Sequence, residues 1–266
     1  MKGARATPRL VFGPSVQPGE RVLPEEVAVA LSFNGTTQAV MMATPADLED
    51  FGVGFALTEG IAQPDEILSV DVVELLRGRD VQVWLKPAAE ARLSARRRTM
   101  SGPVGCGLCG IDSIDQALRE VPVVAPSRFG LTPAQIREAV AALPGEQRLH
   151  DATRAVHGAA FWNGRMLLAR EDVGRHNALD KLVGGMLRQG ITPQGAVVLT
   201  SRVSTDMVQK VAMLGAPMII AVSAPTAEAV ELAERAGITL VALARGDRFE
   251  VFSHTDRLKT EGAHVG

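Results

Sequence analysis

The stretch "AVVLTSRVSTDMVQKVAMLGAPMIIAV", residues 196–222, decides the fold because it predicts a strand, a helix and a second strand in succession. Ala196–Thr200 is a short apolar run of the kind found in fully buried strands, and Pro217–Val222 is another. Between them, Thr205–Leu214 is predicted to be helical. Strands that alternate with single helices indicate an α/β fold whose sheet is covered on both faces.

The pattern continues on both sides of this stretch. Downstream, we expect a helix at Thr226–Ala236 and strands at Thr239–Ala242 and Arg248–Phe252. Upstream, Asn163-Gly164 predicts a hairpin, which makes the sheet mixed rather than purely parallel. Further helices are expected over residues 132–143 and 177–187. We therefore predict an α/β domain with a mixed sheet over residues 126–266.

The first part of the chain predicts a smaller α+β domain over residues 1–105. Residues 1–25 are rich in Pro, Gly and Arg and are expected to form an arm or an edge strand. Asn34-Gly35 predicts a hairpin, and Thr44 is expected to cap a helix that runs to about Glu59. Strands are expected at 70–76 and 81–85. Residues 106–125 are expected to be a mobile, cysteine-bearing linker.

Composition limits the classes of function. The chain has 266 residues, 46% of them hydrophobic, and a net charge of −2, so no basic field favours nucleic acid. The longest apolar runs are of strand length, so no membrane span is expected. The N-terminus has no signal-peptide-like stretch. We expect a soluble cytoplasmic protein.

Both cysteines of the chain lie in "GCGLCG", residues 105–110. Cys106 and Cys109 could share a metal, form a disulfide, act as a redox pair or handle sulfur. A structural zinc needs four ligands, and none of the five histidines is paired at ligand spacing, although a three-ligand catalytic zinc stays open. The flanking glycines disfavour the helix start that a thioredoxin-like pair uses. A mobile thiol suits a persulfide carrier, in which the second cysteine resolves or shares the cargo.

Polar residues follow three successive predicted strands. Ser201, Arg202 and Ser204 follow the first strand, the segment 223–226 with its two hydroxyl residues follows the second, and Arg245 and Arg248 follow the third. Ligands of open α/β sheets bind at the carboxyl ends of strands, where helix N-termini favour anions. The pattern therefore predicts a site for a phosphate-bearing ligand, although no Walker lysine loop or G-x-G-x-x-G motif is present.

Two further histidines allow a structural and a functional interpretation. His176 lies in "AREDVGRHNALDKLVG", residues 169–184, a polar segment that is either a ligand-binding rim or a set of helix caps and surface pairs. His157 lies in an apolar run and fits a hydrogen-bonded core residue better than a catalyst.

Five ordered motifs resemble the formate dehydrogenase accessory sulfurtransferase family, FdhD, from about Thr44 to Arg257. They are "DFGVGFALTEGI", "GCGLCG", "REDVGRHNALDKLVG", "SRVSTDMVQKVAMLGAPMIIAVSAPT" and "LARGDRFEVFSH". The resemblance implies a larger domain similar to cytidine deaminases and a homodimer. It also implies a sulfur relay, in which a cysteine desulfurase loads a persulfide that is passed to a bis-molybdopterin guanine dinucleotide cofactor of molybdenum or tungsten. The sulfurated cofactor then activates formate dehydrogenase.

The resemblance also assigns roles to residues. Cys106 matches the cysteine that holds the persulfide, and Cys109 matches its partner. The segment Leu243–Arg248 matches a cofactor-binding stretch, namely Leu243, Ala244, Arg245, Gly246, Asp247 and Arg248. Leu243 stands where an aromatic residue is common in the family. From their positions alone, Ser201, Arg202, Ser204 and His176 are expected to complete the cofactor site, and no metal ligand is expected.

Two alternatives remain open. A zinc-dependent, deaminase-like hydrolase would need an H-x-E or C-x-E segment and a P-C-x-x-C segment. Here Gly158 and Ala159 follow His157, and Pro103 is not adjacent to Cys106. A non-enzymatic scaffold that only binds formate dehydrogenase is the other alternative, and in that case Cys106 would be dispensable.

Overall fold

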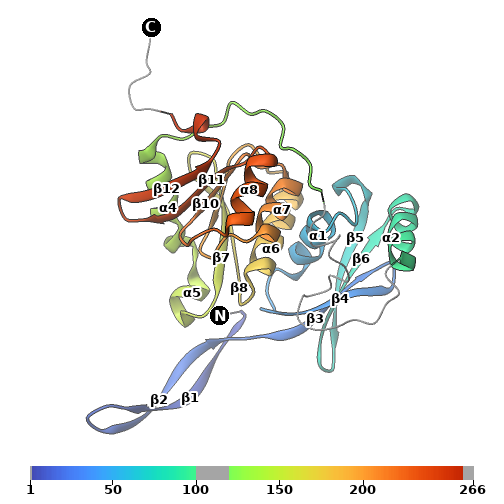
Figure 1. The fold of residues 1–266 in the computed structure, drawn as a ribbon. Helices are drawn as coiled ribbons and strands as arrows, with labels where there is room; N and C mark the ends of the chain where they lie inside the picture. The colour runs from blue at the N-terminus through green and yellow to red at the C-terminus, as the bar shows by residue number, and fades with distance from the viewer. Residues whose placement is uncertain (1, 100–119, 260–266) are drawn as a thin grey trace.

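The computed structural model describes residues 2–99 and 120–259, with only the backbone described for 95–99. Within these ranges the strands form a six-stranded sheet, a four-stranded sheet and a two-stranded ribbon (Figure 1). Cys106 and Cys109 lie outside the described residues, as does most of the linker predicted over 106–125. The predicted domain boundaries therefore stay predictions.

The six-stranded sheet has the order β12-β11-β10-β9-β7-β8. Its strands are β7 (His157–Trp162), β8 (Met166–Asp172), β9 (Ala196–Leu199), β10 (Met218–Ala221), β11 (Thr239–Arg245) and β12 (Arg248–Ser253). β9, β10 and β11 are parallel, whereas β7, β8 and β12 run antiparallel to their neighbours. The mixed sheet is confirmed, and the β7–β8 turn at Asn163-Gly164 is the predicted hairpin.

Helices cover both faces of this sheet, as predicted. One face packs on α6 (Arg175–Arg188), α7 (Thr205–Leu214) and α8 (Ala227–Arg235), and the other on α4 (Pro133–Glu146). A short helix, α5 (Arg148–Thr153), follows α4. Side chains of β9 alternate between the two layers: Val197 and Leu199 join the first core, Ala196 and Val198 the second. This alternation follows from the two-residue period of a strand.

The four-stranded sheet has the order β4-β3-β6-β5. Its strands are β3 (Val27–Phe33), β4 (Thr36–Ala43), β5 (Ile67–Leu75) and β6 (Gly78–Leu85), and α1 (Leu48–Thr58) packs on one face. Two 3-10 turns, η1 (Pro64–Glu66) and η2 (Thr255–Arg257), are also present. The Asn34-Gly35 hairpin is as predicted, with both residues at positive φ.

Two features of this part differ from the sequence-based expectation. The first helix begins at Leu48, not after Thr44, because the Thr44 hydroxyl accepts a hydrogen bond from the amide of Val173 instead of capping a helix. The backbone amide of Thr44 donates a hydrogen bond to the Asp172 carboxylate at 3.0 Å. Helix α2 (Pro87–Thr99) was not expected, because its polar sequence buries little beyond Ala89 and Leu93.

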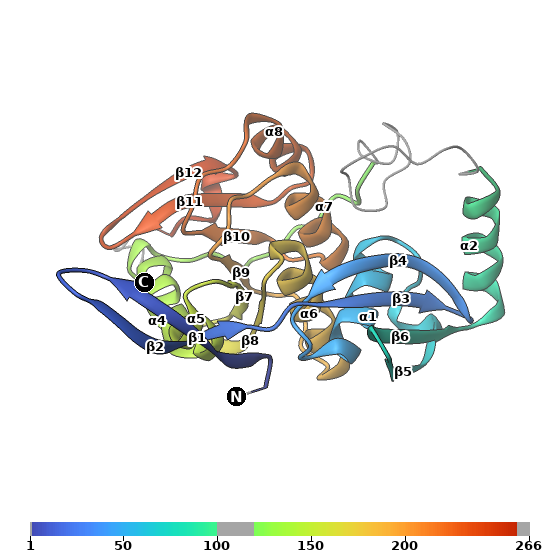
Figure 2. The same cartoon turned by 90° about the horizontal axis from the view of Figure 1, so that it is seen from below.

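A two-stranded ribbon precedes both sheets. β1 (Ala4–Phe12) and β2 (Val16–Pro24) pair antiparallel along their whole length. In Figures 1 and 2 the ribbon reaches out from the body of the molecule, away from the four-stranded sheet. Of the two possibilities for residues 1–25, the arm is therefore the one observed.

Candidate functional site

The carboxyl ends of β9, β10 and β11 meet at one edge of the six-stranded sheet. The parallel register pairs Leu199 with Ala221 and Ile220 with Val241, so the loops that follow these strands are neighbours. Backbone hydrogen bonds join the loops after β9 and β10 directly. The amide of Val203 donates to the carbonyl of Ala224, and the carbonyl of Val203 accepts from the amide of Thr226. This edge, which we call the strand-end site, holds most of the predicted cofactor-binding residues.

The loop after β9 presents Ser201, Arg202 and Ser204. Ser201 is buried, and its hydroxyl donates to the carbonyl of Arg202 at 3.1 Å, whereas the Arg202 side chain is exposed. Ser204 occupies the N-cap position of α7 without a side-chain capping bond. An exposed guanidinium beside a helix N-terminus is an arrangement that favours an anion.

The predicted segment Leu243–Arg248 forms the end of β11 and the turn into β12. Leu243 adopts a left-handed conformation (φ 52°) at a register shift between the strands. The exposed Arg245 donates from Nε to the carbonyl of Val222 at 2.9 Å, which holds its guanidinium at the strand-end site. Gly246 and Asp247 form the exposed turn.

Two members of that segment point elsewhere. Ala244 is buried in the core beside α4, so its side chain does not line the strand-end site. Arg248 is exposed and donates to Glu250 at 2.7 Å. Arg245 is thus the arginine of this segment that the structure holds against the loop after β10.

His176 links the first turns of two helices. Its Nε2 forms an ion pair with Asp206 of α7, and His176 itself lies in the first turn of α6. Burial raises the pKa of Asp206, but the hydrogen bond and charge of His176 outweigh burial and hold that pKa below its usual range. The pair fixes the N-termini of α6 and α7 beside one another.

Sequence reasoning included Arg175 in the polar segment that could form a binding rim, but it missed Asp206 as a member of this region. The Nε atom of Arg175 is buried and has no hydrogen-bond partner among the described residues. Burial lowers the pKa of His157, and the charges of Arg175 and His150 lower it further, which favours a neutral imidazole. The position of Asp206 in the first turn of α7 was the available signal, because helix N-termini of α/β folds line strand ends.

The polar segment of α6 is mostly structural. Asp172 and Lys181 are fully buried and paired at 2.5 Å, and Asn177 donates to Asp172 at 2.9 Å. Asp180 pairs with Lys210 of α7 at 2.9 Å and is likewise buried. Of the residues interpreted as a rim, these four instead join α6 to neighbouring elements.

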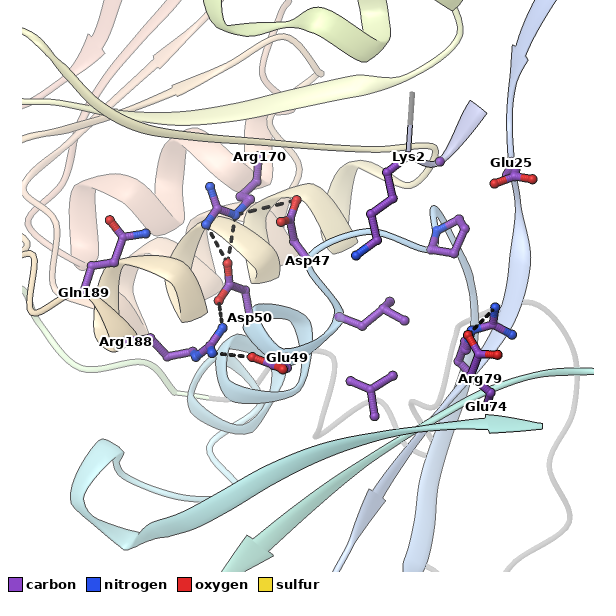
Figure 3. A pocket seen from close by; sticks show the side chains of 14 residues that line it. Lys2, Glu25, Asp47, Glu49, Asp50, Glu74, Arg79, Arg170, Arg188 and Gln189 are labelled. Carbon is purple, nitrogen blue, oxygen red and sulfur yellow. Dashed lines mark hydrogen bonds and ion pairs between the residues drawn. The ribbon is translucent and has the colours of Figure 1, made fainter. Parts of the chain in front are cut away.

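A separate pocket of about 790 Å³ lies between α1, β5, β6 and the far end of α6. Figure 3 shows its ion pairs: the Asp50 carboxylate accepts from Arg170 and Arg188, and Arg79 pairs with Glu74. Arg188 lies at the C-terminal end of α6, about 20 Å from the helix start at the strand-end site. The arginines of this pocket are paired with carboxylates, so we assign it a structural role.

Within residues 2–99 and 120–259, no three His, Cys, Asp or Glu side chains are grouped as they would be to hold a metal ion. In the same part of the chain no helix is both long and apolar enough to cross a membrane.

The fold and the strand-end site define an α/β protein with a basic, helix-lined site at the carboxyl ends of parallel strands. Comparisons with known proteins identify the family. The profile of the FdhD/NarQ family matches residues 24–259, and the chain belongs to this family.

Relatives of this chain support the same assignment. It is 57% identical over 244 residues to the sulfur carrier protein FdhD of Agrobacterium fabrum, with 90% of each chain covered. It is 53% identical over 246 residues to the protein of the same name from Brucella abortus, with 91% of each covered. A crystal structure described as that of a formate dehydrogenase accessory protein from Desulfotalea psychrophila superimposes with a TM-score of 0.77 at 28% identity, covering 96% of this chain and 99% of that one.

Proposed function

We propose that this protein is a cytoplasmic sulfur carrier that matures formate dehydrogenase. It accepts sulfur from a cysteine desulfurase and transfers it to a bis-molybdopterin guanine dinucleotide cofactor of molybdenum or tungsten. The observation that carries the proposal is the 57% identity to a protein named as a sulfur carrier, over 90% of both chains. A reducing cytoplasm suits it, because a carrier thiol must be free between cycles.

Cys106 is proposed as the carrier. Its thiolate attacks the terminal sulfur of a desulfurase persulfide, the S–S bond of the donor breaks, and the donor leaves as a thiolate. The product is a persulfide on Cys106, and no oxidant is consumed. Cys109 can then attack Cys106, which releases the terminal sulfur as hydrosulfide and leaves a disulfide that cellular thiols reduce.

The strand-end site is proposed to bind the diphosphate of the cofactor. Arg245, Arg202 and the first turn of α7 offer guanidinium groups and backbone amides, and these groups recognise phosphate oxygens. The buried Nε of Arg175 lacks a partner in the described part of the chain, as expected for a donor that a ligand would satisfy. Leu243–Arg248, Ser201, Ser204 and His176 stay in the proposed site, with Ala244 contributing through its backbone.

The protein is further proposed to work as a homodimer and to contact both the desulfurase and formate dehydrogenase. The accessory role named for the Desulfotalea structure supports the second contact.

Sulfur loading tests the proposal directly. Purified protein is incubated with a cysteine desulfurase and cysteine, and intact-mass spectrometry is expected to show a gain of one sulfur on Cys106 that reductant removes. Cys106→Ala should not gain sulfur. Cys109→Ala is the matched control, because it removes a thiol from the same segment and should still load. Equal labelling of wild type and Cys106→Ala would refute the assignment.

A further inference from the structure

The β1–β2 ribbon has two chemically different faces. Directly paired residues of an antiparallel ribbon share a face, and the register pairs Ala4 with Pro24 and Phe12 with Val16. One face therefore consists of Ala4, Ala6, Pro8, Leu10, Phe12, Val16, Pro18, Glu20, Val22 and Pro24. The other consists of Arg5, Thr7, Arg9, Val11, Gln17, Gly19, Arg21 and Leu23. The ribbon is amphipathic, with Glu20 as the single charge on its apolar face.

Strand β2 contacts α5, but the outer part of the apolar face has no cover within the described residues. Leu10 is 61% exposed and Phe12 76% exposed, and Val16 and Val22 are exposed as well. An isolated two-stranded ribbon is marginally stable in water and needs a surface to pack against. The alternation places all the arginines of the ribbon on one face. An exposed apolar face of this kind indicates a surface that another protein surface covers.

The arm cannot bury this face against its own four-stranded sheet. Its base is closed by a hydrogen bond from the amide of Glu25 to the carbonyl of Gly3 at 2.7 Å. From this base it extends away from that sheet in both views (Figures 1 and 2). Most of the arm also precedes residues 24–259, the part that matches the family profile.

A second exposed apolar surface lies on the four-stranded sheet, on the face opposite α1. Val40 of β4 pairs with Ala30 of β3, and Met42 pairs with Ala28, so these side chains share one face of the sheet. Val81 and Val83 of β6 and their paired residues on β5 lie on the other face, which packs on α1. The exposed residues of this outer face include Val40, Met42, Val73 and Leu75, of which Val40 is 62% exposed. Val40 and Met42 lie on the edge strand β4, and Val73 and Leu75 lie on the opposite edge strand β5. Ala28 and Ala30 of β3 and Asp80 and Gln82 of β6 lie between them. We call the surface that these four exposed residues border the outer-face patch.

We infer that the arm of one copy packs its apolar face on the outer-face patch of a second copy, and that the exchange is reciprocal. This inference rests on the proposed homodimer and names the surfaces that form it. Two-fold symmetry repeats the arm-to-patch contact, so each arm and each patch is used once and both exposed apolar surfaces of both copies are covered.

The area available is sufficient for such a dimer. Each strand of the arm has nine residues, so the ribbon is about 30 Å long, and its face covers roughly 300 Å². Two arms and two patches then bury about 1,200 Å² in total, the lower end of stable interfaces. Arms packed only on each other would bury roughly half of that area, below this range, which favours arm-to-body exchange.

Oligomeric state tests the inference, because every position to be changed is exposed in the single chain. Light scattering coupled to gel filtration should show a dimer for the wild type. Leu10→Asp on the apolar face should raise the dimer dissociation constant at least about tenfold, because a carboxylate would be buried. Val11→Asp is the matched control, since it adds the same charge one residue later on the polar face and should leave the dimer intact.

The acceptor surface is tested by Val40→Asp, which should weaken the dimer as much as Leu10→Asp. Equal effects of Leu10→Asp and Val11→Asp would overturn the role of the arm. A dimer unaffected by Val40→Asp would overturn the outer-face patch as acceptor. A monomeric wild type would refute the proposed homodimer itself. Sulfur loading of Cys106, measured on the same samples, reports separately on the sulfur-carrier proposal.

Discussion

Gly54 of α1 and Gly184 of α6 face each other where these helices cross, and neither position has room for a side chain. A Cβ atom on Gly54 would lie 1.7 Å from the carbonyl oxygen of Asp180, and one on Gly184 would lie 1.9 Å from that of Asp50. The two sheets are joined through this crossing. Backbone contact at this distance is possible only because both residues are glycine.

Gly54→Ala is therefore expected to destabilise the protein. The methyl group must push α1 away from α6, and overpacking of this kind costs at least about 1–3 kcal/mol in the free energy of unfolding. Urea denaturation measures the change. Gly145→Ala in α4 is the control, because its Cβ would meet no atom within 4 Å and alanine is the better helix former by about 0.5–1 kcal/mol. A Gly54→Ala variant as stable as wild type would contradict the tight crossing.

Asp172→Asn should be strongly destabilising. The Asp172 carboxylate is fully buried and accepts from Lys181, Asn177 and the amides of Thr44 and Gly174. Removing its charge leaves the Lys181 ammonium buried without a counter-ion, which costs about 3–5 kcal/mol. Adding Lys181→Met to Asp172→Asn should recover part of the loss in thermal denaturation. A double variant less stable than Asp172→Asn would show that the charge pair is not the cause.

Because His157 is partly buried, we expect the folded protein to lose stability in mild acid. Burial lowers the pKa of His157 below the ordinary value of 6.5, so the unfolded chain takes up a proton before the folded one does. Stability is unaffected well above pH 6.5 and falls as the pH drops through 6.5 towards the folded-state pKa. His157→Gln should flatten this part of the profile of unfolding free energy against pH. His254→Gln retains His157 and should keep the wild-type slope; a slope unchanged in His157→Gln would rule out this origin.

Arg245→Ala should weaken binding of a guanine nucleoside diphosphate, used as a probe of the proposed cofactor site. Loss of one charge-assisted hydrogen bond at an exposed position predicts about a tenfold rise in the dissociation constant measured by calorimetry. Arg248→Ala should have a smaller effect, because that guanidinium already binds Glu250. Arg235→Ala, at the end of α8 remote from the strand ends, should change nothing. Unchanged affinity in Arg245→Ala would move the site elsewhere.

Elements with strong local signals were predicted from the sequence almost to the residue. Helix α7 spans Thr205–Leu214 as expected, because Ser204 precedes it and Gly215, at φ 83°, ends it. The turns at Asn34-Gly35 and Asn163-Gly164 were equally clear. Helix α2 was missed, because its few apolar residues give no helical periodicity.

The roles of the polar residues were harder to predict. The segment that holds Asp172 and Lys181 was interpreted as either a binding rim or a set of helix caps and surface pairs, whereas the structure buries both residues in the contact with Thr44. His176 was expected at the cofactor site and stays a prediction there, while its partner Asp206 comes from another helix. Sequence spacing reports neighbours on one helix and carries no information about contacts between helices.

The sequence by itself determined the mixed α/β sheet, its helix-covered faces and the place of its strand ends, because hydrophobic period and turn residues act locally. Only the tertiary structure decided which charges meet. Pairs such as Arg188–Asp50 and Arg170–Asp50 join residues more than a hundred positions apart. They form because two helices approach at Gly54 and Gly184, and a buried charge is stable only where packing brings its partner within hydrogen-bond distance.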